Sequence, residues 1–564
     1  MADVSGLPGS YDRFKGARRA GLIAGAVAAV ALTGCATAGS GDDHVPLITV
    51  SQERLEVNSH AYAAFRDRAI VAAPPAPSQL SIAVVRAYTD ANTGTGLVFR
   101  LGERNLGLAD YRSVIALDPN ALSIATVNDH IDHLVTPPLW QVPILLKDNI
   151  ETADQATTAG SLALAENAPD RDAPLVSRLR GAGAIILGKA NLSEWANIRS
   201  SNSISGWSAV GGQTLNPYDP ARTPCGSSSG SAVAVAIGLA PAAIGTETDG
   251  SITCPASVSG VVGFKPTVGL VSRTHIVPIS HSQDTAGPIT TTVEDAAIVL
   301  TAIAGSDPLD PATAEADARR VDYRAALDAN SLQGARLGVM RFLISNYSAE
   351  AQAEFERALV NLRAAGAEIV EITEPPAEFR QIGGWELTVL LTELKRDLNL
   401  YLASTDPAQV RTRTLADVIA FNAAEPRETV LFGQDLFERA EATGGLDDPA
   451  YVEARARSFQ ASGPDGIDRM MADNSVVALI APTTSRAWTN DPDDDDRSQG
   501  SASRLAAVAG YPHLTVPMGF DRGMPVGISF IGGKWDDARI LSLGHAYEQR
   551  TRERRPPTLV QPSS

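Results

Sequence analysis

The sequence predicts a layered α/β fold, because short apolar strands alternate with amphipathic helices along most of its length. Hydrophobic residues make up 44% and charged residues 20% of the 564 residues, a balance typical of a folded globular protein. The formal net charge of −18 disfavours a nucleic-acid partner, since an acidic surface repels phosphates. Three cysteines are too few for a disulfide framework or a cysteine-rich zinc site.

The first half of the chain contains helical pieces at 60–70 and 80–87, which flank a proline-rich hinge at 73–77. From residue 141 onward the alternation of strands and helices is regular. The expected elements there are a strand at 142–146, a helix at 173–181 that ends on a glycine, a strand at 183–187, and a small-residue helix at 232–239 that leads into 242–245.

The second half continues the pattern. Phe355, Leu359 and Leu362 fall on one face of a predicted helix at 349–365. Strands are expected on either side of this helix and again near the C-terminus, at 334–342, 367–372, 476–481, 514–516 and 524–531. The run at 374–466 is mostly polar helix with a weak strand signal and predicts a helical insertion. The acidic stretch at 491–496 predicts a solvated loop, because it lacks the glycine and the terminal glutamate of an EF-hand calcium loop.

The N-terminus has the layout of an export signal. Four basic residues between positions 13 and 19 precede an apolar run at 20–32 that is too short to span a bilayer comfortably. The run ends in Leu32, Thr33, Gly34 and Cys35, which resembles a bacterial lipobox, in which the cysteine is lipidated. We therefore expect a lipoprotein signal peptide at 1–34, a lipidated Cys35 and a tether at 35–59. An ordinary signal peptide with an accidental cysteine is the alternative. Ala36 stands where a signal for retention in the inner membrane usually has Asp, so the resemblance implies a periplasmic protein anchored to the outer membrane.

Three features between residues 147 and 251 indicate chemistry. Lys147 ends an apolar strand, and functional sites of α/β proteins form at that edge of a sheet. A Gly/Ser cluster at 225–231 directly precedes a helix. The loop at 245–252 is rich in small residues, so its backbone N–H groups can converge on a developing oxyanion. Ser251, at the end of this loop, is a plausible nucleophile.

No histidine is placed to act as the base for such a serine. The eight histidines are scattered, and neither the His-Glu-x-x-His motif nor the Gly-x-Ser-x-Gly motif occurs, which disfavours a zinc hydrolase and an α/β-hydrolase triad. A lysine can act as the base in place of histidine when burial and neighbouring donors lower its pKa toward neutrality.

The sequence resembles the amidase signature family over residues 110–550. Ordered blocks carry the resemblance, at 143–150, 157–161, 188–195, 226–231, 245–252, 260–267 and 510–519. The resemblance implies a single catalytic domain at 60–560 with the amidase signature fold, a mixed twisted sheet covered by helices on both faces. It also implies hydrolysis of amide bonds with no metal and no organic cofactor.

Site residues follow from the resemblance by motif. Lys147 matches the catalytic lysine, Ser227 the serine that follows a cis peptide bond, and Ser251 the nucleophile that forms an acyl-enzyme. The oxyanion would face the backbone N–H groups of Thr248, Asp249, Gly250 and Ser251. Cys225 and Cys254 lie close in sequence to the two serines, so we expect both near the site. We expect them as two free thiols, with a disulfide as the alternative.

The stretches at 247–255 and 280–288 look most like the peptide amidase branch of the family, which deamidates C-terminal carboxamides of peptides. Aryl, fatty-acyl and small aliphatic amides are alternative substrates. An unrelated Ser/Lys protease is a further alternative. A surface lipoprotein that binds a ligand without catalysis is a remote alternative. The expected partners are a small-molecule or peptide amide and, through the lipid anchor alone, a membrane. The sequence does not indicate an oligomeric state.

Overall fold

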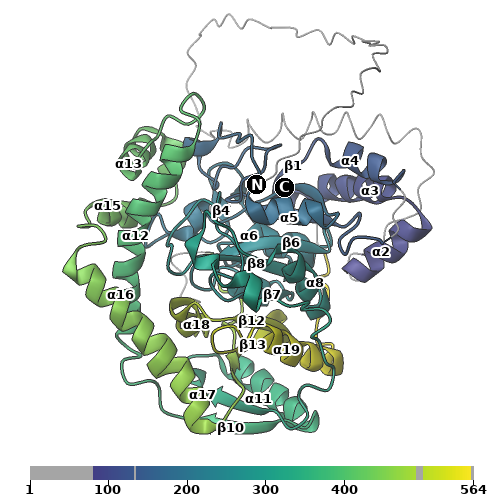
Figure 1. Ribbon diagram of the computed structural model, residues 1–564, viewed down its shortest axis with the longest axis vertical. Coiled ribbons are helices and arrows are strands. Elements are labelled where there is room, and N and C mark those ends of the chain that lie inside the picture. Colours follow the sequence, from purple (N-terminus) through teal and green to yellow (C-terminus); the bar gives the residue numbers. More distant parts are fainter. Residues whose placement is uncertain (1–75, 77–79, 132–134, 491–499, 560–564) are drawn as a thin grey trace, which may run out of the picture. The chain divides into compact units, whose positions relative to one another are not determined.

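The computed structural model describes residues 76, 80–131, 135–490 and 500–559 (Figure 1). Several predicted features lie outside the described residues: the signal peptide at 1–34, Cys35, the tether at 35–59, the helical piece at 60–70, nearly all of the hinge at 73–77, and the acidic loop at 491–496. Among the described helices, none combines the length and the apolar character that crossing a membrane requires.

One large sheet forms the centre of the fold. Within the described residues it has eleven strands in the order β1-β3-β2-β6-β8-β7-β12-β13-β11-β9-β10. Their bounds are β1 Val114–Leu117, β2 Pro143–Lys147, β3 Ile185–Ala190, β6 Ala242–Glu247, β7 Val262–Lys265, β8 Thr285–Thr290, β9 Arg336–Met340, β10 Glu368–Ile372, β11 Ala478–Pro482, β12 His513–Asp521 and β13 Met524–Ile531. Strand β2 runs parallel to β3 and β6, whereas β8 runs antiparallel to β6 and β7, so the sheet is mixed as predicted.

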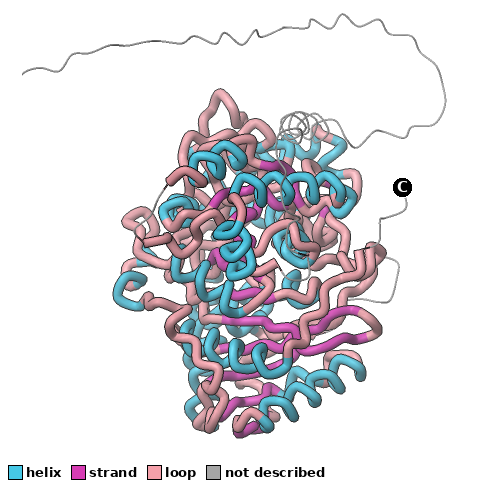
Figure 2. Tube along the Cα trace, turned by 90° about the vertical axis from the view of Figure 1, so that its right-hand side faces the viewer, coloured by secondary structure: helices cyan, strands magenta, loops and turns pink. Residues whose placement is uncertain are grey.

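Helices cover both faces of this sheet (Figure 2). Helices α6 (Ser229–Ala236) and α7 (Thr253–Val258) contact one another and pack on one face. The other face is covered by α5 (Pro174–Gly181), α8 (Val293–Ile303), α19 (Asp537–Thr551) and α11 (Ala349–Ala364), each of which contacts the next. Shorter or peripheral helices are α2 Ile82–Ala91, α3 Gly94–Gly107, α4 Ala121–Asn128, α9 Ala316–Arg319, α10 Arg341–Ile344, α17 Arg469–Asn474 and α18 Ser503–Ala509.

Helix α6 lies unusually close to neighbouring backbone because its residues are small. A Cβ atom at Gly230 would lie 2.3 Å from the carbonyl oxygen of Ser113 and 2.5 Å from the backbone nitrogen of Asn191. Only glycine fits there, so the sequence of this helix brings the Gly/Ser cluster at its N-terminal end against β1 and β3.

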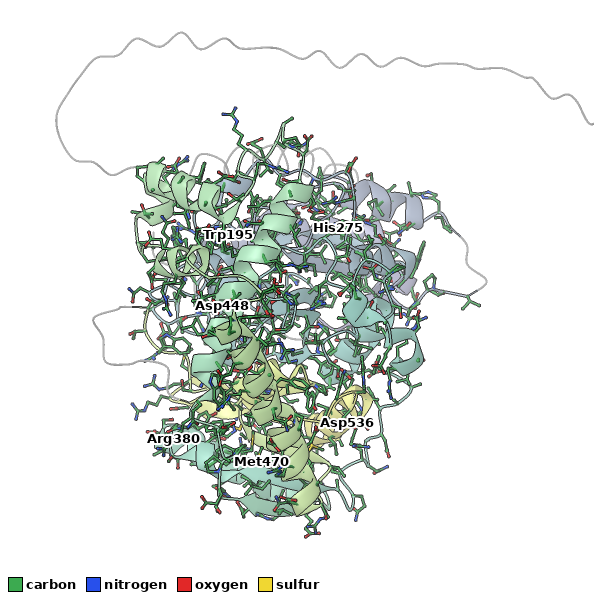
Figure 3. The ribbon with its side chains drawn as sticks, turned by 60° about the vertical axis from the view of Figure 1, so that its left-hand side comes forward. Trp195, His275, Arg380, Asp448, Met470 and Asp536 are labelled. Atoms are coloured by element: carbon green, nitrogen blue, oxygen red, sulfur yellow. A yellow bond between two sulfur atoms is a disulfide. The ribbon has the colours of Figure 1, made fainter. Side chains whose placement is uncertain are left out.

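The predicted helical insertion is present. Between β10 and β11, a span that the structure describes throughout, the long elements are helices and no strand occurs. They are α12 Ile382–Ser404, α13 Leu415–Ala424, α14 Pro426–Thr429, α15 Asp435–Glu441 and α16 Pro449–Ser462, drawn in green in Figure 1. The ring of Trp195, labelled in Figure 3, lies edge-on to that of Phe437 in α15 with 5.8 Å between centroids, which ties the insertion to the rest of the core.

Candidate active site

Lys147 is the last residue of β2, and its side chain is fully buried. Its Nζ atom lies 2.7 Å from the Ser227 hydroxyl, 2.8 Å from the Thr246 hydroxyl and 3.1 Å from the Thr246 carbonyl oxygen. Parallel pairing of β2 with β6 places Leu146 opposite Ile244, so Thr246 reaches the lysine at the same edge of the sheet. No sequence motif marks Thr246 as a partner of the lysine, because the contact depends on how β2 and β6 pair.

Burial lowers the pKa of Lys147 to about 7, although the nearby carboxylates of Asp284 and Glu247 act in the opposite direction. A buried ammonium loses its hydration, which disfavours the charged form. Near neutral pH, therefore, a large share of this lysine carries no charge and can accept a proton.

Ser227 lies between a cis peptide bond and a helix. The bond that joins it to Gly226 is cis. Its side chain is fully buried, and its carbonyl oxygen accepts a hydrogen bond of 3.0 Å from the Ser193 N–H. Helix α6 begins two residues later, at Ser229.

Ser251 follows β6 in the loop that leads into α7. Its carbonyl oxygen accepts a hydrogen bond of 3.1 Å from the Ser228 N–H, which holds the two serine-bearing segments together. The Ser251 residue is 9% exposed, and its hydroxyl has no hydrogen-bond partner among the described residues. A hydroxyl in this position is available to a substrate.

The backbone N–H groups of Thr248, Asp249, Gly250 and Ser251, here called the oxyanion loop, form no hydrogen bond within the described part of the chain. By contrast, the next two N–H groups, of Ile252 and Thr253, both donate to the Glu247 carboxylate, at 2.7 and 3.0 Å. Gly250 has a φ of 78°, a conformation that favours glycine. Four successive free donors can stabilise negative charge on a bound oxygen.

A cavity of about 470 Å³ opens beside these residues. One side is formed by Asn149, Thr246 and Thr248, next to Lys147 and the oxyanion loop. The segment 273–279 forms a second side, which is polar at Arg273, Thr274 and His275 and apolar at 276–279, and α12 contributes a third side. The residues from α12 are Arg396, Asp397, Leu400, Tyr401 and Ser404.

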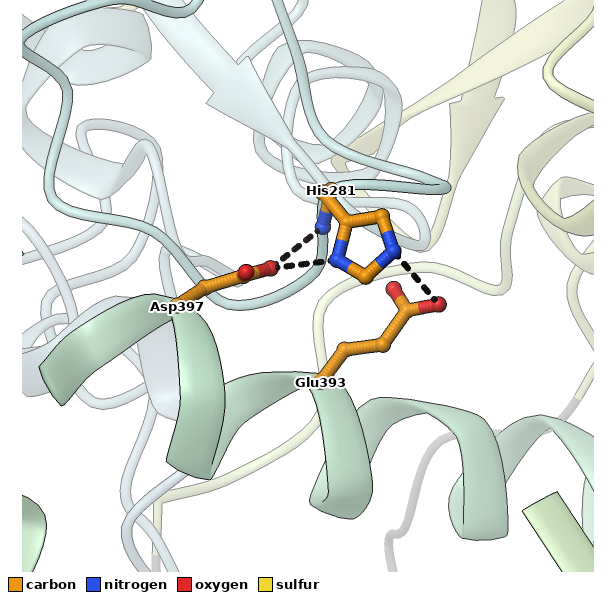
Figure 4. A group of neighbouring side chains, drawn as sticks. All are labelled: His281, Glu393 and Asp397. Atoms are coloured by element: carbon orange, nitrogen blue, oxygen red, sulfur yellow. Dashed lines mark hydrogen bonds and ion pairs between the residues drawn. The ribbon is translucent and has the colours of Figure 1, made fainter. Parts of the chain in front are cut away.

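His281, Glu393 and Asp397 form a group, of which His281 and Asp397 line this cavity and Glu393 lies behind them (Figure 4). The imidazole Nδ1 lies 2.8 Å from the Asp397 carboxylate, and Nε2 lies 3.4 Å from the Glu393 carboxylate. Burial alone would lower the pKa of His281, but the hydrogen bond to Asp397 and the two negative charges outweigh it and raise that pKa. Because the two ring nitrogens face different carboxylates, the group suits a protonated imidazole better than a metal ion, whose ligands converge on one point.

Cys225 and Cys254 form a disulfide, so the expectation of two free thiols is wrong. The hydrogen bond between Ser228 and Ser251 holds the flanking segments side by side, and the two Cα atoms are 6.0 Å apart, within the usual range for a disulfide. Sequence spacing alone could not supply this distance.

A family model described as Amidase matches residues 109–541. A probable amidase of Arabidopsis thaliana is 40% identical over 79% of this chain and 85% of that protein. The native peptide amidase of Stenotrophomonas maltophilia has a similar structure, with a TM-score of 0.80, 49% identity, and coverage of 86% of this chain and 99% of that one. A peptide amidase in complex with the competitive inhibitor chymostatin matches with a TM-score of 0.81 and 49% identity, covering 85% of this chain and 99% of that one.

Proposed function

The chain belongs to the amidase family and hydrolyses amide carbon–nitrogen bonds, and on that premise we propose that it deamidates the C-terminal carboxamide of peptides through a seryl acyl-enzyme. The observation that carries the mechanism is the contact of 2.7 Å between the buried Lys147 amine and the Ser227 hydroxyl. With a pKa of about 7, this amine is a base at neutral pH.

In the proposed mechanism Ser251 attacks the amide carbon. Its proton passes to the Ser227 hydroxyl, whose own proton passes to neutral Lys147. The carbonyl oxygen becomes an oxyanion that accepts hydrogen bonds from the N–H groups of the oxyanion loop. The proton then returns through Ser227 to the leaving nitrogen, and ammonia departs. Water attacks the acyl-enzyme by the same route, which releases the acid and restores Ser251.

The substrate class is supported by the 49% identity to peptide amidase structures over nearly their whole length. The cavity of about 470 Å³ is of the size that binds small organic ligands, and its wall at Ile276 and Val277 is apolar. Because the wall is apolar, aryl and fatty-acyl amides are the alternative substrates.

A substrate screen tests the proposal. N-blocked dipeptide amides, matching anilides and short aliphatic amides are incubated with the enzyme, and released ammonia or amine is measured against a Ser251→Ala control. We expect ammonia from the peptide amides. Anilides that react while peptide amides do not would reject the peptide substrate class, cleavage of internal peptide bonds would favour a protease, and no release at all would favour a binding protein.

We also propose that the protein is exported to the periplasm and anchored through Cys35 to the outer membrane. The N-terminal pattern of basic residues, apolar run and lipobox supports this location. The disulfide between Cys225 and Cys254 adds support, because disulfides persist in oxidising compartments such as the periplasm.

A further inference from the structure

We propose that Glu393 of helix α12 is a positioning residue for the oxyanion loop, on which it acts through the segment 280–284 and Thr248. Glu393 lies outside the part of the chain that carries the candidate catalytic residues. The inference rests on the proposed acyl-enzyme mechanism and adds to it a structural requirement that the helical insertion must meet.

Helix α12 contacts the segment 280–284 through two carboxylates. One oxygen of the Glu393 carboxylate accepts hydrogen bonds from the Ser282 N–H at 3.1 Å, from the Ser282 hydroxyl at 2.9 Å and from the Ser280 hydroxyl. One helical turn further on, Asp397 accepts a hydrogen bond of 2.8 Å from the His281 N–H, in addition to the imidazole shown in Figure 4. Residues four apart share one face of a helix, so Glu393 and Asp397 lie on the same face of α12. From this face their carboxylates accept hydrogen bonds from two backbone N–H groups of the segment.

The segment 280–284 in turn contacts Thr248. Asp284 accepts a hydrogen bond of 2.6 Å from the Thr248 hydroxyl, and its other oxygen accepts from the N–H groups of Ile279 and Ser280 at 2.8 and 2.9 Å. Gln283 donates at 3.3 Å to the Thr248 carbonyl oxygen and at 3.1 Å to Glu386 of α12. The first residue of the oxyanion loop is therefore held at both its side chain and its backbone.

The position of Thr248 matters for the proposed reaction. Hydrogen-bond donors stabilise an oxyanion only when they lie about 2.7–3.1 Å from its position in the transition state. Releasing the segment would let Thr248 shift, and the donors would lose this alignment. Because these bonds strengthen in the transition state, the loss would appear in kcat and not in KM.

Glu393 is suited to this role because it does not line the cavity. The residue is completely buried, and its second oxygen accepts a hydrogen bond of 2.8 Å from Tyr451 of α16. The other charged groups that face this cluster are His281, Arg396, which pairs with Asp397 at 2.5 Å, and Arg273, whose guanidinium donates to the His281 carbonyl oxygen. Any effect of Glu393 on turnover must therefore pass through its neighbours.

The experiment compares Glu393→Ala and Glu393→Gln with Lys395→Ala in the full chain. Lys395 is a matched control, since it lies on the same helix and pairs with Glu441 at 3.2 Å without touching the segment. Values of kcat and KM are measured on any amide that the wild type hydrolyses in a Ser251-dependent manner. We expect Glu393→Ala to lower kcat at least about tenfold with KM changed less than about twofold. Glu393→Gln, which keeps an acceptor oxygen, should stay within about threefold of wild type, and Lys395→Ala should match wild type.

A second variant covers the case in which Glu393→Ala does not fold. Gln283→Leu keeps the size of a buried side chain but removes the donor to Thr248, and it should also lower kcat with KM nearly unchanged. Unchanged kcat in Glu393→Ala, an effect confined to KM, or an equal loss in the Lys395→Ala control would overturn the proposal. Wild-type turnover that does not depend on Ser251 would instead overturn the proposed mechanism, so the two failures are distinguishable.

Discussion

The backbone N–H of Ser228 and the carbonyl oxygen of Ser251 are joined by a hydrogen bond of 3.1 Å, so the segment that carries Ser227 is fastened to the segment that carries the proposed nucleophile. The Nζ atom of Lys147 lies 2.7 Å from the Ser227 hydroxyl oxygen. The three candidate catalytic residues thus come from three separate segments that the fold brings together at one edge of the sheet.

Substitution within this group should abolish or strongly reduce turnover. Ser251→Ala should remove nearly all activity, because in the proposed mechanism no other group carries the acyl intermediate. Ser227→Ala and Lys147→Ala should each cost on the order of 10²–10⁴ in kcat, the scale for loss of acid–base assistance. A double variant should be little worse than the worse single variant, since the groups act as a unit. Steady-state ammonia release measures these losses, and an acyl label found on a residue other than Ser251 would contradict the assignment.

The pH dependence should report Lys147. Since the neutral amine is the base and its pKa is about 7, kcat/KM should rise with pH through about 7 and level off above it. An unperturbed lysine would instead give a rise near its usual value of about 10.4. Initial rates in matched buffers test this, with the residual activity of Lys147→Ala as the control, which should lack the transition. A flat profile in the wild type would argue against lysine as the base.

Removal of the disulfide should destabilise the fold. The bridge closes a sequence separation of 29 residues, for which chain entropy predicts a loss of about 3.6 kcal/mol in the free energy of unfolding. Denaturant unfolding of wild type and of the Cys225→Ala/Cys254→Ala double variant should show this difference. Reductant should destabilise only the wild type. An unreduced mass that corresponds to two free thiols would rule the bridge out.

Gly230→Ala should destabilise the protein by about 1–3 kcal/mol, because the added methyl group would collide with the backbone of Ser113 and Asn191. Gly181, at the end of α5, is a matched control, since a Cβ there meets no atom within 4 Å. Gly181→Ala should be neutral or slightly stabilising. Equal stability of the two variants in denaturant unfolding would contradict the close approach of α6.

Cys35→Ser should abolish lipid attachment and membrane retention while leaving the activity of the purified protein intact. Labelling of cells with a radioactive or clickable fatty acid, followed by fractionation, measures both effects. Cys225→Ser serves as the control, since it should keep the label. Label that persists on the Cys35→Ser protein would exclude the lipobox interpretation.

Much of the fold could be predicted because its elements carry their own pattern. Helix α11 runs from Ala349 to Ala364 with Phe355, Leu359 and Leu362 buried, as their spacing indicated. Lys147 ends its strand as expected. Strand β8 was not predicted, although it lies between β6 and β7. Its Gly287 and Pro288 are typical of a loop, yet a Cβ at Gly287 would lie 2.1 Å from the Phe264 carbonyl oxygen, so tight packing in the sheet requires the glycine.

The local part of the site could be predicted in the same way, whereas its long-range part could not. Lys147 and the Gly/Ser cluster lie in motifs that the sequence displays. The contacts of Glu393 with Ser280 and Ser282 join residues 113 and 111 positions apart, and no local pattern marks a buried glutamate within a polar helix. The disulfide was missed for a related reason, because the distance between two segments is a property of the folded sheet.

The fold places the residues proposed for bond breaking and part of the cavity wall in different parts of the chain. Residues proposed for bond breaking all precede Ile252, while Leu400, Tyr401 and Ser404, on one side of the cavity, belong to the helical insertion. The insertion begins after β10 and ends before β11, and both strands lie at one end of the sheet, on either side of β9. A chimera that exchanges this insertion between relatives could therefore change which amides are accepted while keeping the reaction, provided that the exchanged helix retains the glutamate at position 393.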